Sequence, residues 1–126
     1  MIFQQEPYSE VKFEGLSLYE KHYNEIAEHK DNKSLDINFN LYDSLDKANR
    51  IVFFTLRDNN KTLIGYAMFI LGYPGHYKSS LRATNDILYI LPEHRKGMLG
   101  YKFIKWCEQQ IALIPDIKFI EWHTKT

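Results

Sequence analysis

The spacing of apolar residues divides the chain into segments with a helical period and segments with a strand period. Apolar side chains recur at every third or fourth position over residues 9–28, which predicts helix. Gly15 weakens the early part of this pattern, so two short helices are an alternative to one long helix. A short strand over residues 2–6, ended by Pro7, is expected before this region, and a further short helix through residues 41–49 after it.

Three strand-like segments occupy the middle of the chain. Residues 51–56 and 63–71 are rich in β-branched and aromatic side chains. The polar residues between them are typical of a turn, so the two segments predict an antiparallel hairpin. A third strand is predicted over residues 81–90, after a polar loop over residues 76–80, and it ends at Pro92.

A turn that contains two glycines joins this strand to an amphipathic helix. The turn covers residues 94–100, and the helix is predicted over residues 98–113. The apolar row of the helix consists of Leu99, Phe103, Cys107 and Ile111. Residues 117–122 predict a final strand, and a strand–helix–strand unit places its two strands parallel. The expected fold class is α/β with a mixed (α+β) sheet, in a single domain over residues 1–126.

The turn itself has the properties of an anion site. A helix N-terminus carries backbone N–H groups without intrahelical acceptors and the positive end of the helix dipole. Arg95 and Lys96 add positive charge at the same place. The sequence therefore predicts that this turn holds a phosphate-bearing cofactor.

Composition narrows the functional classes further. The 16 basic and 16 acidic residues cancel, and there is no basic stripe with interleaved aromatic residues, which argues against a nucleic-acid binder. No apolar run reaches the roughly 18 residues that a membrane span needs. Cys107 is the single cysteine, so an internal disulfide is impossible. These features are compatible with a cytoplasmic protein.

The order of helices, antiparallel strands, glycine turn, helix and parallel strand resembles the GNAT-type N-acetyltransferase family. The signature of that family reads Arg/Gln-x-x-Gly-x-Gly/Ala, and Arg95 and Gly100 match it here. Residues 76–89 and 122–125 are similar to a branch of the family found in phage and bacterial genomes. The resemblance covers the chain from about residue 51 to its end, and implies the cytoplasm, or the host cytoplasm for a phage-encoded protein.

The resemblance implies acetyl-CoA as the cofactor, and an amine-bearing small molecule or protein as the acceptor. By this analogy, the backbone of Leu88, Tyr89 and Ile90 pairs with the pantetheine arm as an added strand would. The pyrophosphate is expected at Arg95 and the following backbone N–H groups. These belong to Lys96, Gly97, Met98, Leu99, Gly100 and Tyr101.

Two features depart from the family pattern. Met98 stands where the family usually has a glycine, so its side chain must point away from the phosphates. The usual fold continues after the fifth strand with two more strands and a helix that often carries a tyrosine, which protonates the leaving thiolate. This sequence ends at Thr126. We expect a shortened domain whose last strand has an exposed edge, open to a partner chain or to a second copy in a homodimer.

Acetyl transfer to an amine needs a polarised carbonyl, a neutral amine and a proton donor for the thiolate. Asp86 is the first candidate for the base, because it is expected at the start of the strand before the glycine turn (the fourth strand of the chain), in an otherwise apolar run. The alternative is that Asp86 caps a turn or pairs with a basic side chain. His76, in the loop before that strand, is the second candidate, and simple solvation is its alternative.

The other candidate side chains have more ordinary interpretations. His94 is expected to support the turn, His123 faces the cleft by analogy, and Cys107 is expected to be a buried, inert thiol. Several tyrosines could line the acceptor groove or donate a proton, although packing explains each of them more simply. They are Tyr66, Tyr73, Tyr77 and Tyr89. The five histidines are scattered, which argues against a metal site.

The sequence supports two functional hypotheses of different classes. The first is an acetyl-CoA-dependent N-acetyltransferase in which the acceptor amine attacks the thioester directly. The second is a non-catalytic module of the same fold that binds acyl-CoA, or a protein partner through its open edge. The turn from Arg95 to Gly100 favours the first, whereas Met98 and the absent final layer favour the second.

Overall fold

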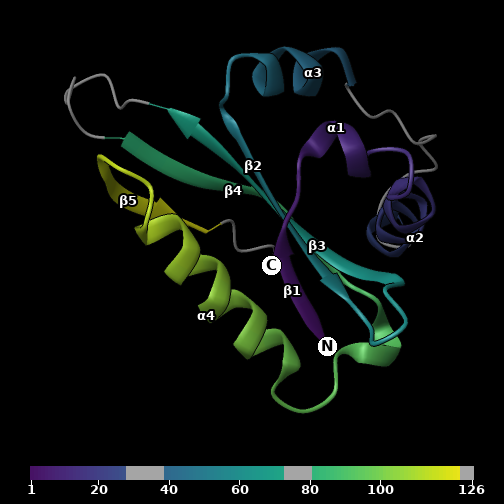
Figure 1. The fold of residues 1–126 in the computed structure, drawn as a ribbon. Coiled ribbons are helices and arrows are strands. Elements are labelled where there is room, and N and C mark those ends of the chain that lie inside the picture. Colours follow the sequence, from purple (N-terminus) through teal and green to yellow (C-terminus); the bar gives the residue numbers. More distant parts are fainter. Residues whose placement is uncertain (28–38, 73–80, 123–126) are drawn as a thin grey trace.

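A computed structural model describes residues 1–27, 39–72 and 81–122 of the protein. Five strands form one sheet in the order β1-β2-β3-β4-β5, with α4 on one face and α1, α2 and α3 on the other (Figure 1). The elements are β1 (Ile2–Gln5), α1 (Tyr8–Val11), α2 (Leu16–Ala27), α3 (Phe39–Lys47), β2 (Ile51–Arg57), β3 (Leu63–Gly72), β4 (Leu81–Ile90), the short 3₁₀ helix η1 (Pro92–His94), α4 (Leu99–Ala112) and β5 (Ile117–Glu121).

This arrangement confirms the predicted fold class. The strands from β1 to β4 are antiparallel neighbours, and β4 and β5 are parallel, as the strand–helix–strand unit predicted. The helical region before β2 is divided into α1 and α2 near Gly15, so the alternative of two short helices is confirmed. The predicted loop over residues 76–80 lies outside the described residues.

The two faces of the sheet bury different kinds of side chain. On the α4 face, the predicted apolar row is confirmed, because Phe103, Cys107 and Ile111 are all 0% exposed. Burial raises the pKa of the Cys107 thiol, so this side chain is a protonated, inert packing group. The opposite face is built from tyrosines: Tyr66 is 1% exposed and packs edge-to-face against Tyr19 of α2. The second face therefore buries hydroxyl groups as well as rings.

A β-bulge in the middle of β4 redirects its side chains. Met68 of β3 pairs with Ile87 and the next residue, Phe69, pairs with Asn85, which leaves Asp86 as an extra residue without a partner on β3. Asp86 therefore lies in the middle of β4 at an irregularity, and the expectation that it stands at the start of the strand was wrong. Side chains alternate along a regular strand, so a bulge changes which residues share a face.

The amide of Asn85 stabilises this bulge from within the sheet. Its Nδ2 donates to the carbonyl oxygens of Met68 at 3.3 Å and Ile87 at 3.0 Å, and Asn85 is only 2% exposed. Carbonyl groups displaced from the regular ladder thus receive hydrogen bonds from a side chain. Buried polar groups cost free energy when they are left without partners, so this amide holds the irregular backbone in place.

We predict that Asn85→Ala lowers the free energy of unfolding by about 1–3 kcal/mol, because it removes both hydrogen bonds to carbonyl groups at the bulge. Urea denaturation followed by circular dichroism measures the change. Gln109→Ala, which removes an exposed amide on α4, is the matched control and should change stability by less than about 0.5 kcal/mol. Equal effects of the two substitutions would show that the Asn85 amide has no role at the bulge.

Candidate active site

Beyond the bulge, one edge of β4 has no neighbouring strand in the part of the chain that the structure describes. β5 pairs with β4 only over residues 81–84. On the other edge, the N–H of Leu91 donates to the carbonyl oxygen of Ile64 on β3 at 2.9 Å. Backbone groups alternate in direction along a strand, so those of Leu88 and Ile90 are directed toward the open edge. An extended ligand with amide groups can add to such an edge as a strand would.

The same alternation shows which of the three residues predicted to pair with a cofactor direct their backbone groups to the open edge. Tyr89 lies opposite Tyr66 of β3 in the ladder, and its backbone groups are directed toward that strand. Of the three, only Leu88 and Ile90 therefore direct backbone groups to the open edge. The side chain of Tyr89 instead belongs to the tyrosine-rich face of the sheet.

The open edge leads to the glycine turn. Gly97 has a φ of +72°, a left-handed conformation that glycine adopts without strain. Met98 precedes the first residue of α4, and it is 58% exposed, so its side chain lies toward solvent, as the sequence required. The N–H of Lys102 donates to the carbonyl oxygen of Met98 at 2.9 Å. The N–H groups of residues 99–101 therefore come before the first hydrogen bond within α4 and are available to an anion.

Arg95 connects this turn to α2. Its Nε donates to the carbonyl oxygen of Ile90 at 2.7 Å, and its two terminal nitrogens donate to the carboxylate of Glu25 at 2.6 and 2.8 Å. The guanidinium also lies over the ring of Tyr89, 5.2 Å from its centre. The hydrogen bonds from Arg95 hold the pKa of Glu25 below its ordinary value. In this structure Arg95 thus binds an internal carboxylate at the place predicted for a phosphate.

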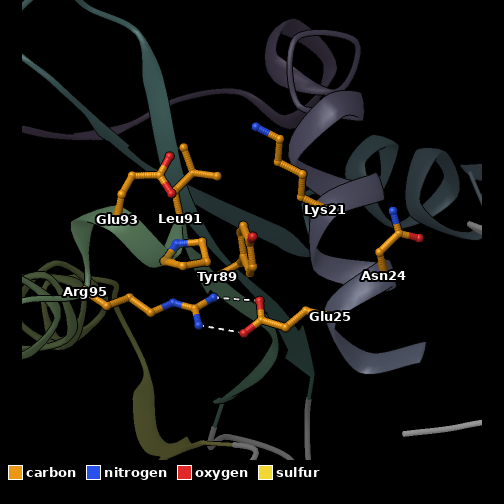
Figure 2. Close-up of a pocket in the computed structure, with 8 residues that line it drawn as sticks. Lys21, Asn24, Glu25, Tyr89, Leu91, Glu93 and Arg95 are labelled. Carbon is orange, nitrogen blue, oxygen red and sulfur yellow. Dashed lines mark hydrogen bonds and ion pairs between the residues drawn. The ribbon is translucent and has the colours of Figure 1, made fainter. Parts of the chain in front are cut away.

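An open pocket of about 470 Å³ lies directly beside this ion pair (Figure 2). Its lining comes from α2 and from the end of β4 with the residues that follow. Lys21 and Glu93 stand on opposite sides, and the ring of Tyr89 and the side chain of Leu91 lie between them. The pocket therefore combines an apolar floor with charged groups of both signs at its rim.

Asp86 lies on the tyrosine-rich face of the sheet, where it meets α3. Its Oδ2 accepts a hydrogen bond of 2.8 Å from the hydroxyl of Tyr42. Asp86 and Tyr89 are three positions apart and would face opposite ways in a regular strand, but the bulge places both side chains toward the helices α1–α3. Among the described residues, Asp86 forms no ion pair, and its hydrogen-bond partner is the hydroxyl of Tyr42.

A histidine that the sequence did not single out lies on the same face. His22 of α2 stacks on Tyr89 with ring centres 4.7 Å apart, and its Nδ1 is 3.0 Å from the hydroxyl of Tyr66. The helical spacing of His22 from Leu18 and Tyr19 places it on the buried side of α2, and this spacing was the available signal. The His22 imidazole therefore joins α2 to the two strands that border the site.

The remaining candidates take ordinary places or lie outside the described residues. His94 belongs to η1, where its N–H donates to the carbonyl oxygen of Leu91 at 2.9 Å, so it supports the turn. His76, the second candidate base, lies outside the described residues, as do His123, Tyr73 and Tyr77. Among the described residues, no group of three or more His, Cys, Asp or Glu side chains could hold a metal ion. No described helix is long and apolar enough to cross a membrane.

Solved structures with the same arrangement define the class of fold. The chain is similar to an aminoglycoside acetyltransferase from an uncultured soil metagenomic sample, in complex with sisomicin, at 15% identity and a TM-score of 0.72, over 99% of this chain and 78% of that one. It is also similar to a predicted acetyltransferase with acetyl-CoA from Clostridium acetobutylicum, at 13% identity and a TM-score of 0.72, over 99% and 81% of the two chains.

A third similar structure is an acetyltransferase from Vibrio fischeri, with 18% identity and a TM-score of 0.65 over 99% of this chain and 98% of that one. No protein-family model and no curated protein matches the sequence. The likeness therefore establishes the GNAT-like fold, and the fold that the sequence resemblance implied is confirmed. The phage-related branch stays a prediction.

We predict that Glu25→Gln lowers stability in a pH-dependent way. Because the hydrogen bonds from Arg95 hold the pKa of folded Glu25 below its ordinary value, the ion pair stabilises the fold above that ordinary value and loses this effect as the pH falls through the folded value. Both side chains are about two-fifths exposed (41% and 42%). Solvent screening therefore limits the difference at pH 7 to about 0.5–1 kcal/mol.

Urea denaturation of wild type and Glu25→Gln at about pH 7 and about pH 3 measures this effect. The control is Glu121→Gln, which removes a looser contact with Arg82 at 3.6 Å and should have a smaller effect at either pH. A difference between wild type and Glu25→Gln that is the same at both pH values would contradict the ionic contribution of Glu25.

Proposed function

We propose that the protein is an acetyl-CoA-dependent N-acetyltransferase that transfers an acetyl group to an amine. The observation that carries this proposal is the continuous path from the open edge of β4 to the N–H groups at the start of α4. The path offers strand-like backbone groups at one end and an anion site at the other. An acyl-CoA has the matching parts in the same order, namely an amide-containing pantetheine arm and a pyrophosphate.

The residues of this chain fit that cofactor through their backbones. Leu88 and Ile90 would bind the pantetheine amides, and the N–H groups of residues 96–101 would bind the pyrophosphate. The exposed side chain of Met98 leaves these N–H groups accessible. When bound, acetyl-CoA supplies an activated acetyl group as a thioester. This protein would contribute binding, orientation and proton transfer.

Arg95 would change partners when the cofactor binds. Its terminal nitrogens are held by Glu25, so a phosphate that uses them must compete with an internal carboxylate. Its Nε bond to Ile90 fixes the end of β4 and need not break. Binding of the pyrophosphate would then release Glu25 toward the pocket between α2 and β4.

We predict that acetyl-CoA raises the melting temperature of the wild-type protein, by an amount equivalent to about 2.7 kcal/mol at roughly 100 times its Kd. Arg95→Ala should weaken acetyl-CoA binding about tenfold or more, because it removes charged hydrogen bonds. Glu25→Gln should strengthen it several-fold, because the competing anion is gone. Thermal-shift titrations with acetyl-CoA measure all three proteins.

Arg82→Ala is the matched control, since Arg82 is a similarly exposed arginine at the other end of β4. It should leave the affinity for acetyl-CoA within about twofold of wild type. No shift of the wild type at millimolar acetyl-CoA would overturn the proposal. A shift without acetylated product across a panel of amines would support the non-catalytic acyl-CoA-binding module instead.

A further inference from the structure

Two groups that can exchange a proton meet just beyond the β4 residues that pair with β5 in the described part of the chain. The hydroxyl of Tyr42 donates to Asp86 Oδ2 at 2.8 Å, and Oδ1 receives no hydrogen bond from any described residue. The bulge at Asp86 closely follows residues 81–84, the part of β4 that pairs with β5 among the described residues. The carboxylate and the phenol therefore lie at the inner end of the open edge, whereas the glycine turn lies at its outer end.

Amide formation from an amine and a thioester requires two proton transfers. When the C–N bond forms and the C–S bond breaks, the nitrogen must lose one proton, and the departing sulfur, which keeps the electron pair, must gain one. A single carboxylate can accept the first proton but begins the reaction without a proton to give. The site therefore needs a second group that starts protonated.

We propose that Asp86 and Tyr42 act as one proton-transfer pair, in which Asp86 accepts the proton of the attacking amine and Tyr42 donates its hydroxyl proton to the departing sulfur. This inference rests on the proposed N-acetyltransferase function. The 2.8 Å hydrogen bond then returns the proton from Asp86 to Tyr42, so both side chains end as they began. The net change is one amine and one thioester converted into one amide and one thiol.

The electrostatics of the pair favour this order of events. Burial and the neighbouring Asp86 carboxylate raise the pKa of Tyr42, so the phenol keeps its proton in the resting protein. When Asp86 takes up the amine proton, its negative charge disappears and the phenol becomes a better acid. The first transfer thus prepares the second, and Tyr42 does not lose its proton before an amine has attacked.

The neighbouring Tyr8 provides a control that distinguishes proton donation by Tyr42 from simple packing. Tyr8 of α1 lies edge-on to Tyr42, with ring centres 6.1 Å apart, on the same face of the sheet. The Tyr8 hydroxyl is buried and has no hydrogen-bond partner among the described residues. Tyr8→Phe is therefore a matched control, because it removes a buried hydroxyl from the same cluster and leaves the pair with Asp86 intact.

The first test measures acetyl-CoA binding by thermal shift and CoA release with hydroxylamine, a small amine that is uncharged at neutral pH. Tyr42→Phe and Asp86→Asn should each bind acetyl-CoA within about twofold of wild type and release CoA about 100-fold more slowly or worse. The double variant should be no slower than the slower single variant, because the two groups act as a unit. Tyr8→Phe should stay within about threefold of wild type.

The second test needs no turnover and uses the folded wild-type protein. In protein labelled with ¹³C-tyrosine, the Cζ resonance that disappears in Tyr42→Phe belongs to Tyr42. This resonance should shift on addition of CoA but not of desulfo-CoA, because the hydroxyl is proposed to contact the sulfur. It should also shift in Asp86→Asn, whereas the Tyr8 resonance should not.

The outcomes separate this inference from the proposed function. A wild-type protein that does not bind acetyl-CoA would overturn both. Binding by the wild type together with Tyr42→Phe turnover within threefold of wild type would overturn only the role of Tyr42. Equal effects of CoA and desulfo-CoA on the Tyr42 resonance would also overturn only the role of Tyr42. The same conclusion would follow if the double variant lost CoA-release activity by the product of the two single-variant factors.

Discussion

The extra residue in β4 is the constraint on which the rest of the site depends. Without the bulge, Asp86 and Tyr89 would face opposite sides of the sheet, and Asp86 could not reach Tyr42 on α3. Among the described residues, the pairing of β5 with β4 also ends two residues before Asp86, so no described strand covers this edge of β4 beyond it. One inserted residue therefore lies both beside the uncovered edge of β4 and at the place where Asp86 meets Tyr42.

Different kinds of interaction hold the two ends of the open edge in place. At the inner end, the amide of Asn85 and the hydroxyl of Tyr42 stabilise an irregular backbone and an acidic side chain. At the outer end, Arg95 joins the last residue of β4 to Glu25 on α2. At the inner end Asn85 is buried and the Tyr42–Asp86 hydrogen bond is partly buried, whereas both partners of the outer ion pair are about two-fifths exposed.

The sequence predicted most of the fold, because the apolar periods of β2, β3, β4 and α4 are regular, and the turn with Arg95 and Gly100 indicated the family. It could not predict the bulge, since one extra residue in a strand leaves no periodic signal. Asp86 was placed at the start of the strand because the apolar run begins only at Ile87. Tyr42 and His22 were missed because their contacts join α3 and α2 to strands distant in sequence. The partner of Arg95, Glu25, is 70 positions away and was likewise invisible to local pattern.

Amide hydrogen exchange with and without acetyl-CoA would show whether the open edge of β4 binds the cofactor through its backbone. The N–H of Ile90 should become protected when acetyl-CoA is added, because it is directed toward the open edge. The N–H of Tyr89 should be protected already, because it is directed toward β3. Protection elsewhere on the protein with no change at Ile90 would contradict the account.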